Sequence, residues 1–229
     1  MQRSFFSYFL KQSSIKKVSA DKMMTKSKGR VWHKKHKQHG IVPSRLRNID
    51  REATWGFSNT VGWIYGHGTF CVTALKLPVL GLFRWMENAA HEGKQLETEV
   101  SPYTGLVKRV FMDSRADDQQ LYFDLKEKHH IQLVTRPRKG MDKSPQRMLM
   151  IAQMLTRQNL KDYRQRAVTV EPMQGLMKAV FDLQTCWMHG NRSNRWLFAA
   201  MGVAVQIAQL AAYRSGQSTW NIKQAVLGT

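Results

Sequence analysis

The pattern of hydrophobic and polar positions divides the chain into a strand-rich front part and a helical rear part. Short apolar or alternating runs bounded by turn residues predict strands over residues 15–20, 62–82, 107–112 and 131–135. Apolar positions three and four residues apart predict helices over residues 92–99, 118–128, 144–158, 172–188 and 193–214. Strands interleaved with helices and followed by a helical third predict an α/β fold with a mixed central sheet.

Two stretches need a local interpretation. Gly66 and Gly68 fall inside the first long strand-like region, where a tight hairpin is the default expectation. Residues 196–213 are apolar enough to suggest a transmembrane helix, but Gln206 and Gln209 interrupt the apolar run. We therefore expect a buried core helix here and no membrane partner.

The predicted domain covers residues 15–214. A basic extension over residues 1–14 precedes it, and a tail over residues 215–229 follows it. Residues 22–49 contain many lysines and arginines, two glycines, several histidines and no acidic residue. This composition predicts a basic loop or insertion within the domain.

The overall charge narrows the class of partner. The formal net charge is +20 and the sequence pI is about 10.3, which favours a polyanion, with nucleic acid first and an acidic membrane surface as the alternative. Cys71 and Cys186 have no metal-ligand spacing, so a reducing, cytoplasmic and nucleoid-associated setting is expected. Walker motifs, serine elbows and Cys/His nucleophile pairs are absent from the sequence.

Carboxylates are scarce, and three of them stand where elements begin or end. Asp113 closes a predicted strand, and Asp21 follows the weaker first strand. Glu171 precedes Pro172, which suits the first helical position, so Glu171 is expected at the mouth of a helix. Lys178 lies about two turns further along the same helix.

Asp21, Asp113 and Glu171 together offer the ligands that a pair of Mg²⁺ ions requires. Such ions lie roughly 3.5–4 Å apart in two-metal sites, and oxygen-only ligands favour Mg²⁺, with Mn²⁺ as a substitute. Each acid also has an ordinary interpretation. Asp113 is also suited to capping the following turn, Asp21 to an exposed loop, and Glu171 to the positive end of the helix dipole.

The residues around Glu171 carry a resemblance to a known family. Tyr163, Arg166, Glu171 and Lys178, separated by two, four and six residues, resemble the Y-R-E-K signature of a large bacterial group of DDE-type insertion-sequence transposases. Residues 169–178 (TVEPMQGLMK) carry the most specific part of this likeness. Residues 112–121 (MDSRADDQQL) are similar to the family's second-aspartate block, and residues 21–35 (DKMMTKSKGRVWHKK) resemble its first-aspartate block.

The resemblance implies an RNase H-like fold and Mg²⁺-dependent cleavage and transfer of DNA strands at the terminal inverted repeats of an insertion sequence. It implies that Asp21, Asp113 and Glu171 are the catalytic, metal-binding acids. Candidate DNA-binding residues lie beside Glu171 and in the basic segment, where an aromatic ring could stack on an unpaired base. They are Tyr163, Arg164, Arg166, Lys178, Trp32, Lys34 and Lys35.

Transposases of this group usually carry an N-terminal DNA-binding and dimerisation region, and this sequence begins almost at the first aspartate. A homodimer is therefore expected of a full-length protein, acting on the double-stranded DNA of transposon ends and target. Two alternatives remain open at this stage. One is a truncated, non-catalytic DNA-binding remnant, and the other is an RNase H-like nuclease that does not join strands.

Overall fold

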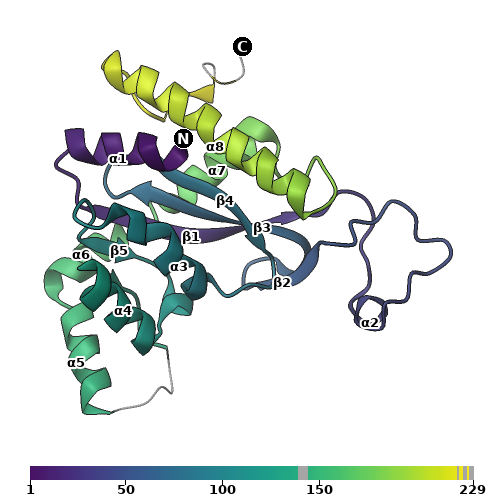
Figure 1. Cartoon of the computed structure of the whole chain (residues 1–229), viewed down its shortest axis with the longest axis horizontal. Helices are drawn as coiled ribbons and strands as arrows, with labels where there is room; N and C mark the ends of the chain where they lie inside the picture. Colours follow the sequence, from purple (N-terminus) through teal and green to yellow (C-terminus); the bar gives the residue numbers. More distant parts are fainter. Residues whose placement is uncertain (139–143, 221, 224–225, 227–229) are drawn as a thin grey trace.

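A mixed sheet flanked by helices forms the centre of the protein (Figure 1). The structure, a computed structural model, describes residues 1–138, 144–220, 222, 223 and 226. The strands are β1 (Lys17–Lys26), β2 (Thr54–Ser58), β3 (Gly62–Ala74), β4 (Leu80–Glu87), β5 (Arg109–Phe111) and β6 (Gln132–Val134). The helices are α1 (Gln2–Gln12), α2 (Lys34–Gln38), α3 (Glu92–Val100), α4 (Gln119–His129), α5 (Pro145–Met154), α6 (Arg157–Arg164), α7 (Val170–Phe181) and α8 (Asn191–Arg214), with short 3-10 turns η1 (Ser101–Tyr103) and η2 (Ser114–Ala116). The predicted mixed α/β class is confirmed.

Strand β3 organises the sheet. It pairs antiparallel with β1 on one side and with both β2 and β4 on the other, while β5 and β6 extend the sheet beyond β1 as parallel strands. In the parallel pair of β1 and β5, Ser19 lies opposite Phe111. Asp21 lies two residues after Ser19, and Asp113 lies two residues after Phe111. The pairing register therefore brings these two predicted acids to the same level of the sheet.

The two faces of the sheet are covered by different helices. On one face, Val18 and Ala20 of β1 belong to a buried cluster that includes residues of α1, α3, α4 and α5. On the other face, Met23 belongs to a second cluster built with α7 and α8. Because side chains alternate along a strand, Asp21 has the same parity as Met23, and α7 covers that side. This alternation directs Asp21 toward the helix that carries Glu171.

Glutamine side chains seal the exposed edge of β4. Gln2 accepts a hydrogen bond from the Phe83 backbone N–H at 2.8 Å, and Gln209 accepts one from the Leu80 N–H at 2.8 Å. Gln206 donates to the Leu80 carbonyl at 3.0 Å. Edge strands carry unpaired backbone groups, so these amides replace a missing neighbouring strand.

Helix α8 is long and apolar enough to cross a membrane by the measures of length and composition alone. In the structure it packs along β4, and its Gln206 and Gln209 side chains are buried at 1% exposure. The glutamines that interrupt the apolar pattern are thus the residues that attach this helix to the sheet, as the core-helix prediction requires.

Several predicted boundaries differ from the structure. The hairpin expected at Gly66 and Gly68 is wrong, because both residues lie inside the continuous strand β3. A Cβ at Gly66 would lie 1.9 Å from the Thr25 carbonyl oxygen, so glycine serves a close approach of two strands here. The predicted helix over 144–158 is two helices, because the Thr156 hydroxyl caps α6 by accepting from the Asn159 N–H at 3.2 Å.

The predicted extension and basic loop also contain regular structure. Residues 1–14 hold α1, whose Phe6 and Leu10 are fully buried in the main core. Within residues 22–49, strand β1 continues to Lys26 and α2 forms a short helix in a segment that projects from the body of the protein (Figure 1). Part of the predicted tail, 215–229, lies outside the described residues.

Candidate active site

The site forms where β5 ends beside the middle of β1. Asp21 stands on β1, opposite Cys71 of β3. Asp113 follows β5 after one residue, and its Oδ1 accepts a hydrogen bond from the Arg115 N–H at 2.9 Å. Asp113 thus caps the turn η2, as its ordinary interpretation expects, and faces Asp21 as well. One side chain serves both purposes because a carboxylate has two oxygens.

A third acid, Glu92, joins these two and was not among the predicted site residues. One carboxylate oxygen each of Asp21, Glu92 and Asp113 lies within 4.8 Å of the other two. Glu92 is the first residue of α3 and is only 3% exposed. Its sequence neighbourhood reads as a polar helix start, where an acid is common for the helix dipole alone. Only the return of the chain from β4 through α3 brings it to the strand ends.

Glu171 lies on the other side of Asp21 and is joined to it through Arg166. The Arg166 guanidinium is 3.0 Å from Asp21 Oδ2 and 3.3 Å from Glu171 Oε1. The Glu171 side chain is 52% exposed, whereas that of Asp21 is 16% exposed. Helix α7 begins at Val170, so Glu171 lies in its first turn instead of preceding it, and Pro172 follows inside that turn.

One cavity of about 530 Å³ contains all three predicted acids. It lies between β1, the β2–β3 turn, α3, η2 and α7. The charged side chains that line it are Asp21, Lys22, Glu92, Asp113, Arg115, Arg166, Glu171 and Lys178. Residues far apart in the sequence therefore meet in a single polar hollow with both signs of charge.

Burial perturbs two of these acids strongly. Burial, reinforced by the negative charges of Asp113 and Glu171, raises the pKa of Asp21 to about 6, although Arg166 opposes the shift. Burial, with Asp113 and Asp21, likewise raises the pKa of Glu92 to about 7. Carboxyl groups with raised pKa values in a polar cavity are typical of metal or catalytic sites, since a cation there would stabilise the ionised forms.

The DNA-binding candidates near Glu171 differ in their surroundings. Lys178 lines the cavity two turns after Glu171 on α7. Arg164 is exposed at the end of α6. Tyr163 packs its ring against a small buried cluster, and the Arg136 guanidinium lies 5.4 Å from the ring centroid. Tyr163 is therefore partly a packing residue.

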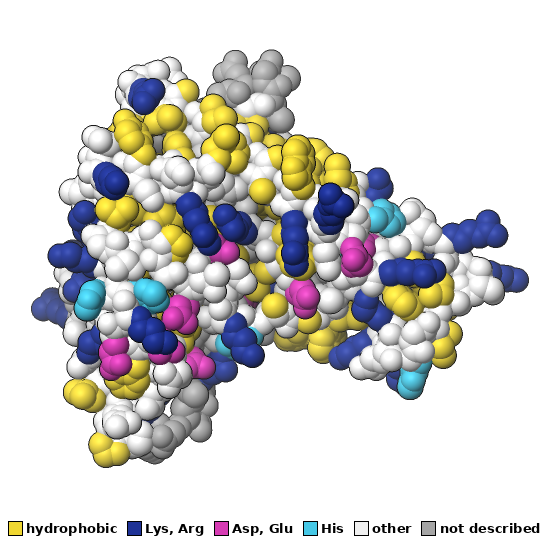
Figure 2. Space-filling view, in the orientation of Figure 1, with side chains coloured by type: hydrophobic (Ala, Val, Ile, Leu, Met, Phe, Trp, Pro, Cys, Tyr) yellow, Lys and Arg dark blue, Asp and Glu magenta, His cyan; other side chains and the backbone are white. Residues whose placement is uncertain are grey.

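In the basic segment, the structure separates the lysines from the tryptophan. Lys34 and Lys35 are exposed on α2, and Lys and Arg side chains project from the tip of this segment (Figure 2). Trp32 is 7% exposed and packs in a small core with Tyr65, and its Nε1 donates to the Ile41 carbonyl at 2.8 Å. Its ring is enclosed by protein and does not offer a face to a base.

An exposed aromatic pair stands at the rim of the site instead. Trp63 is 57% exposed and Phe57 is 45% exposed, and their rings meet edge to face at 5.3 Å. The Lys34 ammonium lies 4.1 Å from the Trp63 ring centroid. Both residues belong to the β2–β3 hairpin, whose turn lines the cavity of the acids. Sequence reasoning missed this pair because strand aromatics usually face a core.

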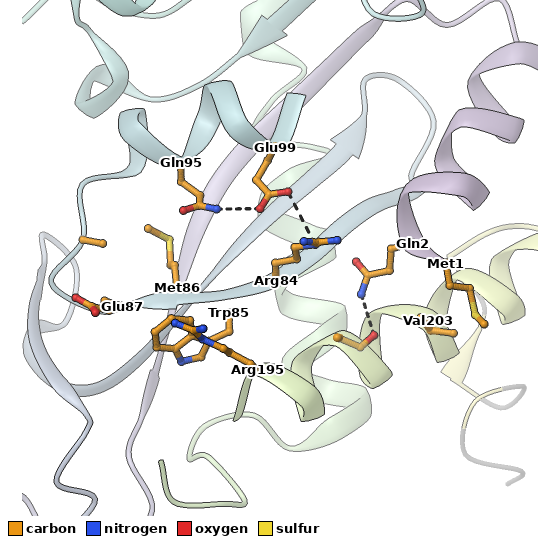
Figure 3. Close-up of a pocket in the computed structure, with 12 residues that line it drawn as sticks. Met1, Gln2, Arg84, Trp85, Met86, Glu87, Gln95, Glu99, Arg195 and Val203 are labelled. Carbon is orange, nitrogen blue, oxygen red and sulfur yellow. Dashed lines mark hydrogen bonds and ion pairs between the residues drawn. The ribbon is translucent and has the colours of Figure 1, made fainter. Parts of the chain in front are cut away.

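A second and larger cavity, about 710 Å³, lies away from these acids between β4, α3 and α8 (Figure 3). Glu99 joins its neighbours here, accepting from Gln95 at 2.8 Å and lying 3.9 Å from Arg84. The Arg195 guanidinium lies 4.2 Å from the Trp85 ring centroid. None of the predicted site residues lines this cavity, so it is not the candidate site.

Comparison with known proteins finds similarity to a solved structure but not to a protein-family model or a curated sequence. No protein-family model matches the sequence, and no curated protein matches it. Among solved structures, the chain is similar to that of a piggyBac transposase synaptic complex with hairpin DNA, with a TM-score of 0.54 and 10% sequence identity. The match covers 92% of this chain and 51% of that chain. At this identity the likeness is one of fold, and this chain spans about half the length of that transposase.

Proposed function

We infer that the protein is the catalytic domain of a DDE-type DNA transposase with an RNase H-like fold. The observation that carries this proposal is the meeting of Asp21, Asp113 and Glu171 in one cavity with Arg166 and Lys178. Glu171 and Lys178 lie on α7, and the other three residues come from β1, the end of β5 and the segment between α6 and α7. The fold-level likeness to a transposase and the antiparallel-then-parallel strand order support the same proposal.

The donor set fits divalent cations of the Mg²⁺ class. The acids offer only carboxylate oxygens, which are the hard ligands that Mg²⁺ and Mn²⁺ prefer. When bound, two such ions would activate an attacking water or 3′-hydroxyl and stabilise the leaving oxygen at a phosphodiester. We propose that Asp21 and Asp113 hold these ions from the sheet and that Glu171 does so from α7.

The basic residues of the site would bind the DNA backbone. Lys178 lies in the cavity on the same helix as Glu171, where its ammonium can meet a phosphate next to the reacting bond. Arg166 pairs with both Asp21 and Glu171 in the structure. Cation binding by the acids would free its guanidinium for a phosphate, since the carboxylates would then have other partners. The net charge of +20 suits a long polyanion such as double-stranded DNA.

We also propose a substrate, an oligomeric state and a cellular location for the full-length enzyme. The substrate is proposed to be the terminal inverted repeats of a bacterial insertion sequence, with strand cleavage followed by transfer to target DNA. The full-length enzyme is proposed to work as a homodimer in the bacterial cytoplasm, bound to the nucleoid.

A DNA cleavage and joining assay tests the proposal. The protein is incubated with plasmid DNA that carries the sequences flanking its gene, with Mg²⁺ or with EDTA. We expect Mg²⁺-dependent nicks at the element ends and joining of the new 3′-hydroxyls to target DNA. Asp113→Asn should abolish both reactions while salt-dependent DNA binding stays within about threefold, because the lost charge is a single acid among many bases.

Asp124→Asn is the matched control, since this acid lies on α4 and pairs with Lys128 on the surface. It should retain full activity. Binding without any nick in Mg²⁺ would identify a non-catalytic DNA-binding remnant. Nicking without strand joining would identify an RNase H-like nuclease. Either result contradicts the transposase proposal.

A further inference from the structure

The carboxylates of Glu92, Asp21 and Asp113 surround one small space. The Glu92 carboxylate shares a span of at most 4.8 Å with those of Asp21 and Asp113. Each of the three comes from a rigid support: a strand, the end of a parallel strand, and the first turn of a helix. Glu171, in contrast, lies outside this group and is half exposed.

Glu92 has one anchored oxygen and one orphaned oxygen. Its Oε1 accepts from the Arg115 guanidinium at 3.2 Å, and the same guanidinium donates to the Phe57 carbonyl at 3.0 Å. Its Oε2 is buried and has no hydrogen-bond partner among the described residues. The side chain is thus held in place by Arg115, and Glu92 is among the residues that line the cavity of the acids.

A purely structural ion pair between Glu92 and Arg115 explains only half of this arrangement. A buried carboxylate oxygen without a donor is destabilising, and two further carboxylates nearby increase the penalty. Lys22 offsets the charge of Glu92 only in part and does not satisfy its second oxygen, because the ammonium donates to the Asn88 and Ala90 carbonyls at 2.7 and 3.0 Å. A cation between the three acids removes the penalty and satisfies the orphaned oxygen.

The spacing is compatible with a single hard cation. Oxygen ligands lie about 2.0–2.1 Å from Mg²⁺, so adjacent ligands of an octahedral ion are about 2.9 Å apart and opposite ones about 4.1 Å apart. The three oxygens are at most 4.8 Å apart, so they close onto one ion with movements of about 1–2 Å, which side-chain rotation supplies.

We propose that Glu92 is a direct ligand of a divalent cation that it shares with Asp21 and Asp113. This cation lies on the α3 side of Asp21. Arg166 fills the opposite side, where it bridges Asp21 and Glu171. The site therefore binds its first ion through Asp21, Glu92 and Asp113, without Glu171. Since it shares two acids with the proposed active site, the inference rests on the proposed function, but metal binding can be measured without DNA.

Titration of the full chain with Mn²⁺, with free Mn²⁺ measured by electron paramagnetic resonance, tests the assignment. Glu92→Gln keeps the shape of the side chain and removes its charge, so it should weaken the tightest Mn²⁺ site at least tenfold. Glu171→Gln should change that site less than threefold. Glu97→Gln is the matched control, because Glu97 is on the same helix and pairs with His129 outside the site. It should bind Mn²⁺ as the unaltered chain does.

A second measurement uses the unaltered protein and does not depend on the folding of a variant. Fe²⁺ bound at the site, with ascorbate and peroxide, generates hydroxyl radicals that cut the nearby backbone. Cuts are expected around Asp21, Asp113 and Glu92. An unchanged Mn²⁺ affinity in Glu92→Gln, or the absence of cuts around Glu92, overturns the inference. Mn²⁺ binding that is lost in Glu171→Gln but kept in Glu92→Gln overturns it while leaving the transposase proposal intact. Failure of the unaltered chain to bind Mn²⁺ overturns both.

Discussion

Removing the charge of Glu92 should stabilise the metal-free protein, and the size of the effect follows from its burial. Burial, with the charges of Asp113 and Asp21, raises the pKa of Glu92 from its ordinary 4.5 to about 7. The folded protein thus binds this proton more tightly than the unfolded chain. At about 1.4 kcal/mol for each pH unit of separation, the ionised form destabilises the fold by about 3 kcal/mol.

The sign of the pH dependence is fixed by the direction of the shift. Below the unfolded pKa, Glu92 is protonated in both states and no penalty exists. Between pH 4.5 and about 7 the unfolded chain releases this proton while the folded protein still holds it, so the free energy of unfolding falls as the pH rises. Above pH 7 Glu92 is ionised in both states, and the full destabilisation is present. Glu92→Gln should therefore be more stable than the unaltered chain at pH 8 and not at pH 4.5.

The expected net gain at pH 8 equals the full penalty. The variant amide loses its charged contact with Arg115, but the charge of Arg115 is already among the causes that set the pKa of Glu92 and is not subtracted again. A net stabilisation of about 3 kcal/mol corresponds to a rise in melting temperature of about 6–12 °C for a chain of this size. Thermal unfolding followed by circular dichroism in EDTA, at pH 8 and pH 4.5, measures it.

Mg²⁺ should reverse the order of stability. A cation that binds only the folded state stabilises the unaltered chain by an amount that grows with the logarithm of the Mg²⁺ concentration relative to the dissociation constant, and the weaker-binding Glu92→Gln should gain less. Glu97→Gln should follow the unaltered chain under both conditions. A Glu92→Gln protein that melts below the unaltered chain at pH 8 in EDTA would refute the reasoning, since the ion pair with Arg115 would then outweigh the burial of the charge.

Three further predictions concern the support and the rim of the site. Asp117→Asn should destabilise the protein by about 3 kcal/mol in urea unfolding, because it removes one charge of the buried ion pair between Asp117 and Arg147; a change below about 1 kcal/mol contradicts this. Gly66→Ala should destabilise by more than about 2 kcal/mol, since its Cβ would meet the Thr25 carbonyl oxygen at 1.9 Å, and an unchanged midpoint would disprove the close approach. Trp63→Ala should weaken binding of a fluorescent single-stranded oligonucleotide by about five- to tenfold with an unchanged melting temperature, because an exposed ring beside the cavity can stack on a base, and equal anisotropy curves would exclude that role.

The sequence by itself determined the type of most elements and the identity of the three candidate acids. Strand β5, helix α4 and helix α8 lie within a few residues of their predicted ranges, because each has a clear apolar period and, for α4, a capping residue in Asp118. Asp113 was found for a local reason: it directly follows the apolar run of a buried strand. Signals of this kind are carried by neighbouring residues and need no tertiary contact.

The tertiary structure decided which residues meet. Glu92 is separated from Asp21 by β2, β3 and β4, so no local pattern distinguishes it from an ordinary acid at a helix start. The enclosure of Trp32 and the exposure of Trp63 depend likewise on which strand covers which ring. Burial, pairing register and charge proximity are properties of contacts between distant segments. The sequence therefore specified the chemical groups of the site, and the packing of the sheet and helices selected those that face one another.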